Sequence, residues 1–118
     1  MGCGPGAAAR AVAARLTTGH VLATDRSAAA VDLARSGSAA ELASGRMGVR
    51  HVAGEDFVLG PGEEPYDLVF AFRVGALDGR HPELGRRVLE RLVRATAPTA
   101  RLFVDGGAPL RELPLRQG

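Results

Sequence analysis

The chain has 118 residues, which is enough for one domain with a single hydrophobic core. Apolar residues make up 46% of it and charged residues 24%, as in ordinary globular proteins, and no apolar run is long enough to span a bilayer. The net charge is only +2, and the one cysteine has no second cysteine to pair with, so we expect a cytoplasmic protein without a membrane role.

Glycines dominate the first six residues, Met1-Gly2-Cys3-Gly4-Pro5-Gly6, just before a predicted helix. The alanine-rich segment 7–16 contains no helix breaker and predicts that helix. Glycine permits backbone angles and close approach that a side chain forbids, and a helix N-terminus offers N–H groups to an anionic or polar ligand. The pattern indicates a ligand-binding loop, with a simple turn into the helix as the alternative.

Short apolar strands and helices alternate after this loop. Ser27 is expected to cap a second helix that Gly37 weakens or interrupts, with an inner face holding Val31, Leu33, Ala34 and Leu42. A third helix is expected to begin at Pro82 and end at Pro98, with an apolar stripe of Leu84, Val88, Leu92 and Ala95. Strands are predicted at 20–24, 49–53, 66–72 and 101–105.

This alternation predicts an α/β fold, with a mostly parallel sheet between helices. We expect one domain over residues 1–118, in which 106–118 form a loop-like tail that contains two prolines.

Acidic residues follow two of the predicted strands. Asp25 lies directly after strand 20–24, about 20 residues beyond the glycine loop, where a carboxylate can accept hydrogen bonds from ribose hydroxyls. Glu55 and Asp56 follow the next strand, and ligands of open parallel sheets bind at this carboxyl edge. The plainer alternatives are that Asp25 caps the next helix and that Glu55 and Asp56 are solvated loop acids.

Of four further side chains, His81 and Cys3 each have a functional and a plainer interpretation. His81, in a predicted loop, is placed where a general base might act, but a lone loop histidine is more often solvated. Cys3 is interpreted as a small buried filler rather than a nucleophile, although a helix N-terminus would lower its pKa. Phe70 is expected in the core, whereas Phe72 at the strand end could line a pocket. No metal is expected, because the three histidines lack ligand spacing.

The loop, the strand-end acids and the strands together resemble the class I S-adenosylmethionine-dependent methyltransferases. The resemblance covers residues 2–107, in the segments GCGPG, VLATD, SAAAVDLAR, GED, YDLVFAF and RRVLERLVRATAPTARLFVDGG. It implies a three-layer αβα Rossmann-like fold that binds S-adenosylmethionine. Compared with the family, the chain is expected to be truncated at both ends, without the strand before the glycine loop and without the last two strands.

The resemblance also implies roles for particular residues. Asp25 would hold the ribose hydroxyls of the cofactor, and Arg26 would lie beside the adenine. Glu55, or Asp56 next to it, would contact the adenine amine. The end of strand 66–72, at Phe72, would face cofactor and substrate, as would the following Arg73. The loop would lie against the methionine and ribose parts through Gly2, Cys3, Gly4 and Gly6.

The activity implied is methyl transfer to an unidentified small-molecule acceptor, for which the protein positions the reactants and excludes water. Two other readings stay open: a non-catalytic remnant or module completed by a partner chain or a second copy, and an NAD-type binder. The last is open because Gly2-x-Gly4-x-x-Ala7 with Asp25 meets the loose dinucleotide pattern. Nucleic-acid binding is not expected, since no aromatic residues interleave the arginines of segment 86–94.

Overall fold

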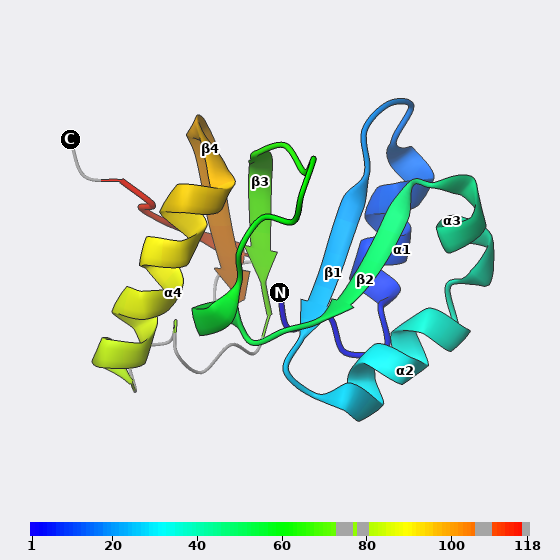
Figure 1. Cartoon of the computed structure of the whole chain (residues 1–118), viewed down its shortest axis with the longest axis horizontal. Coiled ribbons are helices and arrows are strands. Elements are labelled where there is room, and N and C mark those ends of the chain that lie inside the picture. The colour runs from blue at the N-terminus through cyan, green and yellow to red at the C-terminus, as the bar shows by residue number, and fades with distance from the viewer. Residues whose placement is uncertain (73–76, 78–80, 106–109, 117–118) are drawn as a thin grey trace. The chain divides into compact units, whose positions relative to one another are not determined.

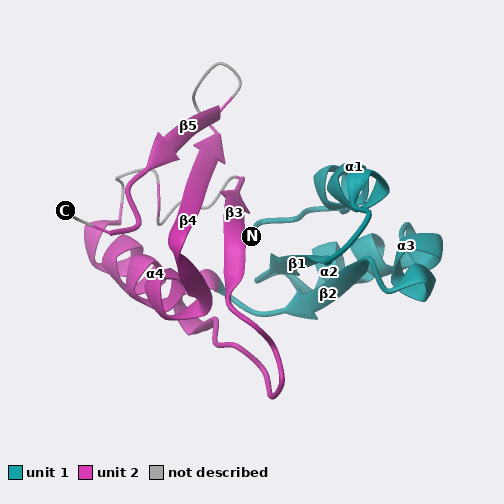
Figure 2. Ribbon diagram, turned by 90° about the horizontal axis from the view of Figure 1, so that it is seen from above, with its two compact units in different colours: residues 1–53 teal, residues 54–118 magenta. Residues whose placement is uncertain are grey.

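The structure, a computed structural model, describes residues 1–72, 77, 81–105 and 110–116 (Figure 1). Residue contacts group the chain into two compact units, 1–53 and 54–118, which Figure 2 distinguishes by colour. Each unit has its own strands and helices.

The first unit is a parallel strand pair covered by helices. It contains α1 (Ala7–Arg15), β1 (Val21–Asp25), α2 (Ala28–Ser36), α3 (Ala39–Ser44) and β2 (Met47–His51). β1 and β2 are parallel, with Val21 opposite Met47. A parallel pair requires a crossover connection, which α2 and α3 provide. All three helices contact the strands, and side chains of α1 and α3 pack around a small core of Ala13, Ala23 and Met47.

The predicted helix caps and breaks of this unit are confirmed. Ser27 accepts a hydrogen bond from the Ala30 N–H at 3.2 Å and caps α2, and the helix stops before Gly37. Leu33 is 61% exposed and does not belong to the inner face, because at about 100° per residue it lies away from Val31 and Ala34. The second strand begins at Met47, two residues earlier than predicted.

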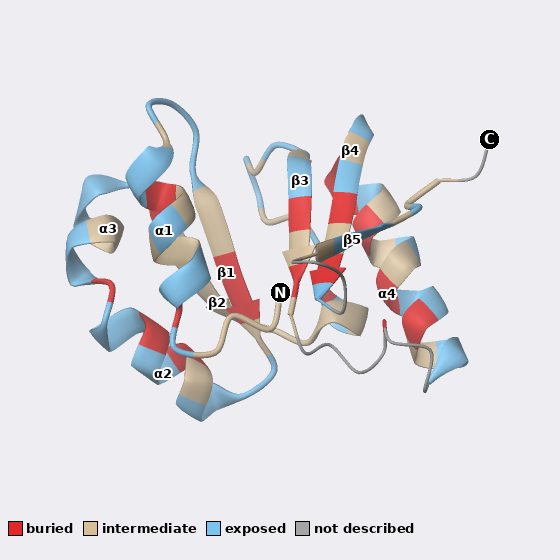
Figure 3. Cartoon of the chain, turned by 180° about the vertical axis from the view of Figure 1, so that it is seen from behind, coloured by how far each residue is buried: buried red, intermediate tan, exposed pale blue. Residues whose placement is uncertain are grey.

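The second unit is a three-stranded sheet with a helix packed on it. It contains η1 (Gly54–Asp56), β3 (Tyr66–Ala71), α4 (Pro82–Ala95), β4 (Thr96–Asp105) and β5 (Leu110–Leu113). β3 and β4 are parallel, and β5 is antiparallel to β4. The buried face of α4 includes Val88, Leu92 and Ala95, as the apolar stripe predicted (Figure 3).

Two expectations for the second unit are wrong. α4 ends at Ala95 and β4 begins at Thr96, so Pro98 lies inside a strand and does not end the helix itself. A proline disfavours helical angles in the residue before it and clashes with the carbonyl four residues back, so the helix stops earlier. The tail is not all loop either, because residues 110–113 form β5, and Arg101 of β4 donates two hydrogen bonds to Glu112, at 3.0 and 2.8 Å.

Candidate functional site

The glycine loop leads into α1 with backbone angles that favour glycine. φ is 66° at Gly2, 52° at Gly4 and 89° at Gly6, all in the left-handed region. The Gly6 N–H donates to the Cys3 carbonyl at 2.9 Å, which closes the turn, and Gly6 is the N-cap residue of α1. Because glycine has no side chain that can cap a helix, the first N–H groups of α1 are suited to a ligand.

Two hydrogen bonds attach this loop to the carboxyl end of β1. The Cys3 N–H donates to the Thr24 carbonyl at 2.9 Å. The Gly4 N–H donates to Oδ2 of Asp25 at 3.1 Å. The predicted loop and the first predicted acid therefore form one local structure.

Both carboxylate oxygens of Asp25 have a protein partner. While Oδ2 accepts from Gly4, Oδ1 accepts from the Ser27 N–H at 2.9 Å, just before α2. Asp25 therefore contacts the backbone in front of α2, but the residue that caps this helix is Ser27, not Asp25 as the plainer alternative expected. Each carboxylate oxygen has a second lone pair, and Asp25 is only half-buried, so this geometry still leaves acceptor capacity for hydroxyl groups.

Gly4 and Gly6 serve different purposes. A Cβ on Gly6 would lie 3.2 Å from the Cβ of Ala34, so glycine there allows the loop to approach α2 closely. A Cβ on Gly4 would meet no atom of the described residues within 4 Å. The loop therefore packs on α2 at Gly6, and the space beside Gly4 is open.

Cys3 is half-buried and packs as a small filler, so it is less enclosed than the buried position expected for it. Its side chain packs against the core of Ala13, Ala23 and Met47, and its Sγ donates to the Gly4 carbonyl at 3.4 Å. Burial raises the pKa of the Cys3 thiol, and the negative charge of Asp25 raises it further. The pKa of this thiol is therefore raised overall, not lowered, because burial and the charge of Asp25 have the larger effect.

Arg26 lies at the surface directly after β1. Its side chain is exposed, and its carbonyl accepts a hydrogen bond from Nε2 of His51, at the end of β2, at 2.9 Å. This bond joins the ends of the two parallel strands behind Asp25.

The second pair of acids belongs to the second unit. Glu55 is half-buried in η1, and its carbonyl accepts a hydrogen bond from Nε of Arg91 on α4 at 3.2 Å; Asp56 is exposed. The next residue, Phe57, is buried and its ring packs edge-on to Tyr66 with centroids 6.5 Å apart. η1 is therefore held to α4 and β3 rather than being a free loop.

Phe72 ends a row of aromatic rings on the second sheet. Its ring stacks on Phe70 with centroids 6.3 Å apart, and Phe70 contacts Phe103 of β4 at 6.2 Å. All three are half-buried, so Phe70 is less enclosed than the core position expected for it.

Comparison with known proteins interprets this geometry. Residues 1–99 match the family model described as "Methyltransferase domain". The chain belongs to the class I S-adenosylmethionine-dependent methyltransferases. No curated protein sequence matches the chain.

Solved structures share the methyltransferase fold at low sequence identity. The [4+2]-cyclase SpnF has a TM-score of 0.67 at 21% identity, over 87% of this chain and 35% of that chain. The plantazolicin methyltransferase BpumL, solved with a triazolic desmethylPZN analog and SAH, has a TM-score of 0.63 at 17% identity, over 87% and 35%. A TehB-like SAM-dependent methyltransferase from Corynebacterium glutamicum has a TM-score of 0.64 at 19% identity, over 87% and 50%.

These likenesses establish the Rossmann-like α/β fold expected from the alternating strands and helices. The chain spans about a third to a half of the length of these three structures, at 35%, 35% and 50%.

One candidate of the methyltransferase site, Arg73, lies outside the described residues. His81 is an exposed residue at the N-terminus of α4. Within the described part of the chain, no group of three or more His, Cys, Asp or Glu side chains is arranged to hold a metal ion. Nor does any helix in the described ranges have the length and apolar character needed to cross a membrane.

Sequence reasoning missed one pair of residues beside the methyltransferase loop. Arg10 of α1 donates to the Pro5 carbonyl at 2.8 Å and to Oγ of Ser38 at 3.0 Å. The available signal was an arginine one turn into an alanine-rich helix, which by itself predicts a solvated side chain.

Proposed function

We propose that this chain binds S-adenosylmethionine and that the protein uses it to methylate a small molecule. The observation that carries the proposal is the attachment of the glycine loop to Asp25, through the 3.1 Å bond from the Gly4 N–H. This bond places the Gly4 N–H of the loop next to the carboxylate at the end of β1. A ligand with both an anionic group and ribose hydroxyls matches that combination.

The residues present fit this cofactor. The uncapped N-terminus of α1 suits a carboxylate, because its N–H groups and helix dipole favour negative charge. Asp25 retains acceptor capacity for ribose hydroxyls, and the space beside Gly4 is open among the described residues. Arg26, Glu55, Asp56 and Phe72 are proposed to contact the adenine side and the substrate.

When bound, S-adenosylmethionine supplies a methyl group on a sulfonium, which a nucleophilic N, O or C atom of the acceptor displaces. The role of the chain is then to orient the cofactor and the acceptor and to exclude water. The loop amides would hold the methionine part of the cofactor, and Asp25 would hold its ribose. The half-buried ring of Phe72 would add an apolar wall at the end of β3.

The fold alone does not define the reaction, since one of the structures with this fold is described as a [4+2]-cyclase. Cofactor binding is therefore the first property to test. Titration of the purified chain with S-adenosylhomocysteine by calorimetry should give saturable binding, and the ligand should raise the melting temperature. Stabilisation by NAD alone would overturn the proposal in favour of a dinucleotide binder.

Asp25→Asn tests the carboxylate. Removing the charge while keeping one carbonyl oxygen should weaken S-adenosylhomocysteine binding about tenfold, the scale of a lost hydrogen bond to a charged group. Asp32→Asn, an exposed site on α2, is the matched control and should leave affinity unchanged. Equal affinities for the two variants would remove Asp25 from the site.

A second candidate is a module completed by another chain. Among the described residues, β1 pairs with no strand but β2, and β3 with no strand but β4, so each leaves an edge at which a further strand can pair. Light scattering after size-exclusion chromatography distinguishes the two readings. An oligomer that binds no S-adenosylhomocysteine would favour this candidate over the first.

A further inference from the structure

The glycine loop is held on its helix side by one arginine. Nη1 of Arg10 carries two hydrogens and donates to two acceptors, the Pro5 carbonyl at 2.8 Å and Oγ of Ser38 at 3.0 Å. Pro5 has no N–H, so this carbonyl is its one backbone hydrogen-bonding group. Ser38 is fully buried and does not cap α3, although it is the residue before that helix.

The guanidinium lies where the loop meets the turn between α2 and α3. A Cβ on Gly6 would be 3.2 Å from Nη1 of Arg10, and a Cβ on Gly37 would be 3.0 Å from the same atom. Glycine at these two positions therefore leaves room for the guanidinium. Arg10 fills the space that these glycines leave and connects the loop to the buried hydroxyl of Ser38.

We propose that Arg10 is a positioning residue that keeps the glycine loop in its binding shape. Asp25 holds the loop from β1 through Gly4, and Arg10 holds it from the helices through Pro5. Without Arg10 the Pro5 carbonyl loses this partner, and the turn between Cys3 and Gly6 loses its side-chain hydrogen bond to the helices. The consequence for S-adenosylmethionine rests on the proposed function, whereas the effect on the loop itself does not.

Arg10→Met tests this role because methionine retains the length of the apolar stem without the donors. The matched control is Arg46→Met. Arg46 is also half-buried and also donates two hydrogen bonds to backbone carbonyls, to Gly19 at 3.0 Å and to Thr17 at 2.7 Å, at the turn before β1.

The first readout is amide hydrogen exchange of Gly6, whose N–H donates to Cys3, and it needs no ligand. Arg10→Met should lower Gly6 protection about tenfold, and Arg46→Met should leave it unchanged. The second readout is the affinity for S-adenosylhomocysteine well below the melting temperature, which should fall about three- to tenfold in Arg10→Met alone, because fewer molecules hold the competent loop.

The outcomes separate the two proposals. If the wild type does not bind S-adenosylhomocysteine while Gly6 exchange rises only in Arg10→Met, the proposed function fails and the positioning of the loop stands. If the wild type binds and Arg10→Met binds equally well, the positioning role is overturned. An equal rise of Gly6 exchange in Arg46→Met would also overturn it.

Ser38→Ala provides a second variant if Arg10→Met does not fold. It removes one acceptor of Arg10 and keeps the bond to Pro5, so it should shift Gly6 exchange in the same direction by a smaller factor. The double variant should show no more Gly6 exchange than Arg10→Met, because both changes break the same connection. An additive effect in the double variant would contradict the connection through Ser38.

Discussion

At the scale of single residues, Gly6 is required both by its backbone angle and by its packing. Its φ of 89° penalises any side chain, and a Cβ would also press on Ala34 at 3.2 Å. Gly19 has a similar φ of 77°, but a Cβ there would meet no described atom within 4 Å. Comparing Gly6 with Gly19 therefore separates the energetic cost of the left-handed backbone angle from the cost of close packing.

Gly6→Ala and Gly19→Ala should differ in their cost to stability. Gly19→Ala should lower the free energy of unfolding by about 1 kcal/mol, the cost of a left-handed angle. Gly6→Ala should cost about 2–4 kcal/mol, because overpacking adds to the same angle. Urea denaturation measures both, and equal losses would mean that the contact with Ala34 relaxes freely.

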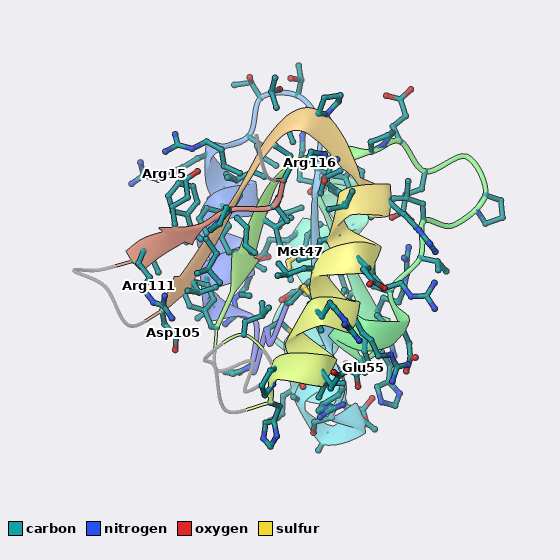
Figure 4. All side chains as sticks on the ribbon, turned by 90° about the vertical axis from the view of Figure 1, so that its left-hand side faces the viewer. Arg15, Met47, Glu55, Asp105, Arg111 and Arg116 are labelled. Carbon is teal, nitrogen blue, oxygen red and sulfur yellow. The ribbon has the colours of Figure 1, made fainter. Side chains whose placement is uncertain are left out.

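At the scale of elements, the C-terminal end of α4 is held by a residue from the tail. Arg116 donates to the carbonyls of Val93 at 2.8 Å, Thr96 at 3.0 Å and Ala97 at 3.0 Å (Figure 4). The last carbonyls of a helix have no partner within it, and a cation is favourable there. Arg116 thus provides hydrogen-bond partners for carbonyls at the direct junction of α4 and β4.

Arg116→Met should lower the free energy of unfolding by about 1–3 kcal/mol, because several carbonyls lose a charged donor together. Arg111→Met, an exposed change on β5, should stay within about 0.5 kcal/mol of the wild type. Thermal unfolding of the two variants measures the difference. If both changes cost the same, the contacts of Arg116 contribute little.

At the scale of the whole molecule, local pattern predicted much of the fold. The order of strands and helices was predictable because alternation and apolar stripes are local properties, and so was the position of Asp25 at the end of a strand. β5 was not, since it depends on pairing with β4, and the helix end was displaced because a proline stops a helix before its own position rather than at it. The contacts of Arg10 could not be predicted from the sequence either, because they form only once α1 packs beside Ser38.

The expectation of one domain predicts that both units unfold together. The single tyrosine, Tyr66, reports on the second unit, and the single cysteine, Cys3, reports on the first. In urea, Tyr66 fluorescence and the reactivity of the Cys3 thiol should change at the same midpoint, as for a two-state domain. Separate midpoints would mean that residues 1–53 and 54–118 fold independently.

The direct junction of α4 and β4 has a consequence for how the length of this chain can vary. One residue added or removed between Ala95 and Thr96 would turn the helix by about 100° relative to the strand. If the helix kept its place, β4 would instead reverse its faces and expose the fully buried Leu102. Substitutions at this junction keep that spacing, but insertions and deletions do not, so variation in length belongs in connections such as the turn after Gly60.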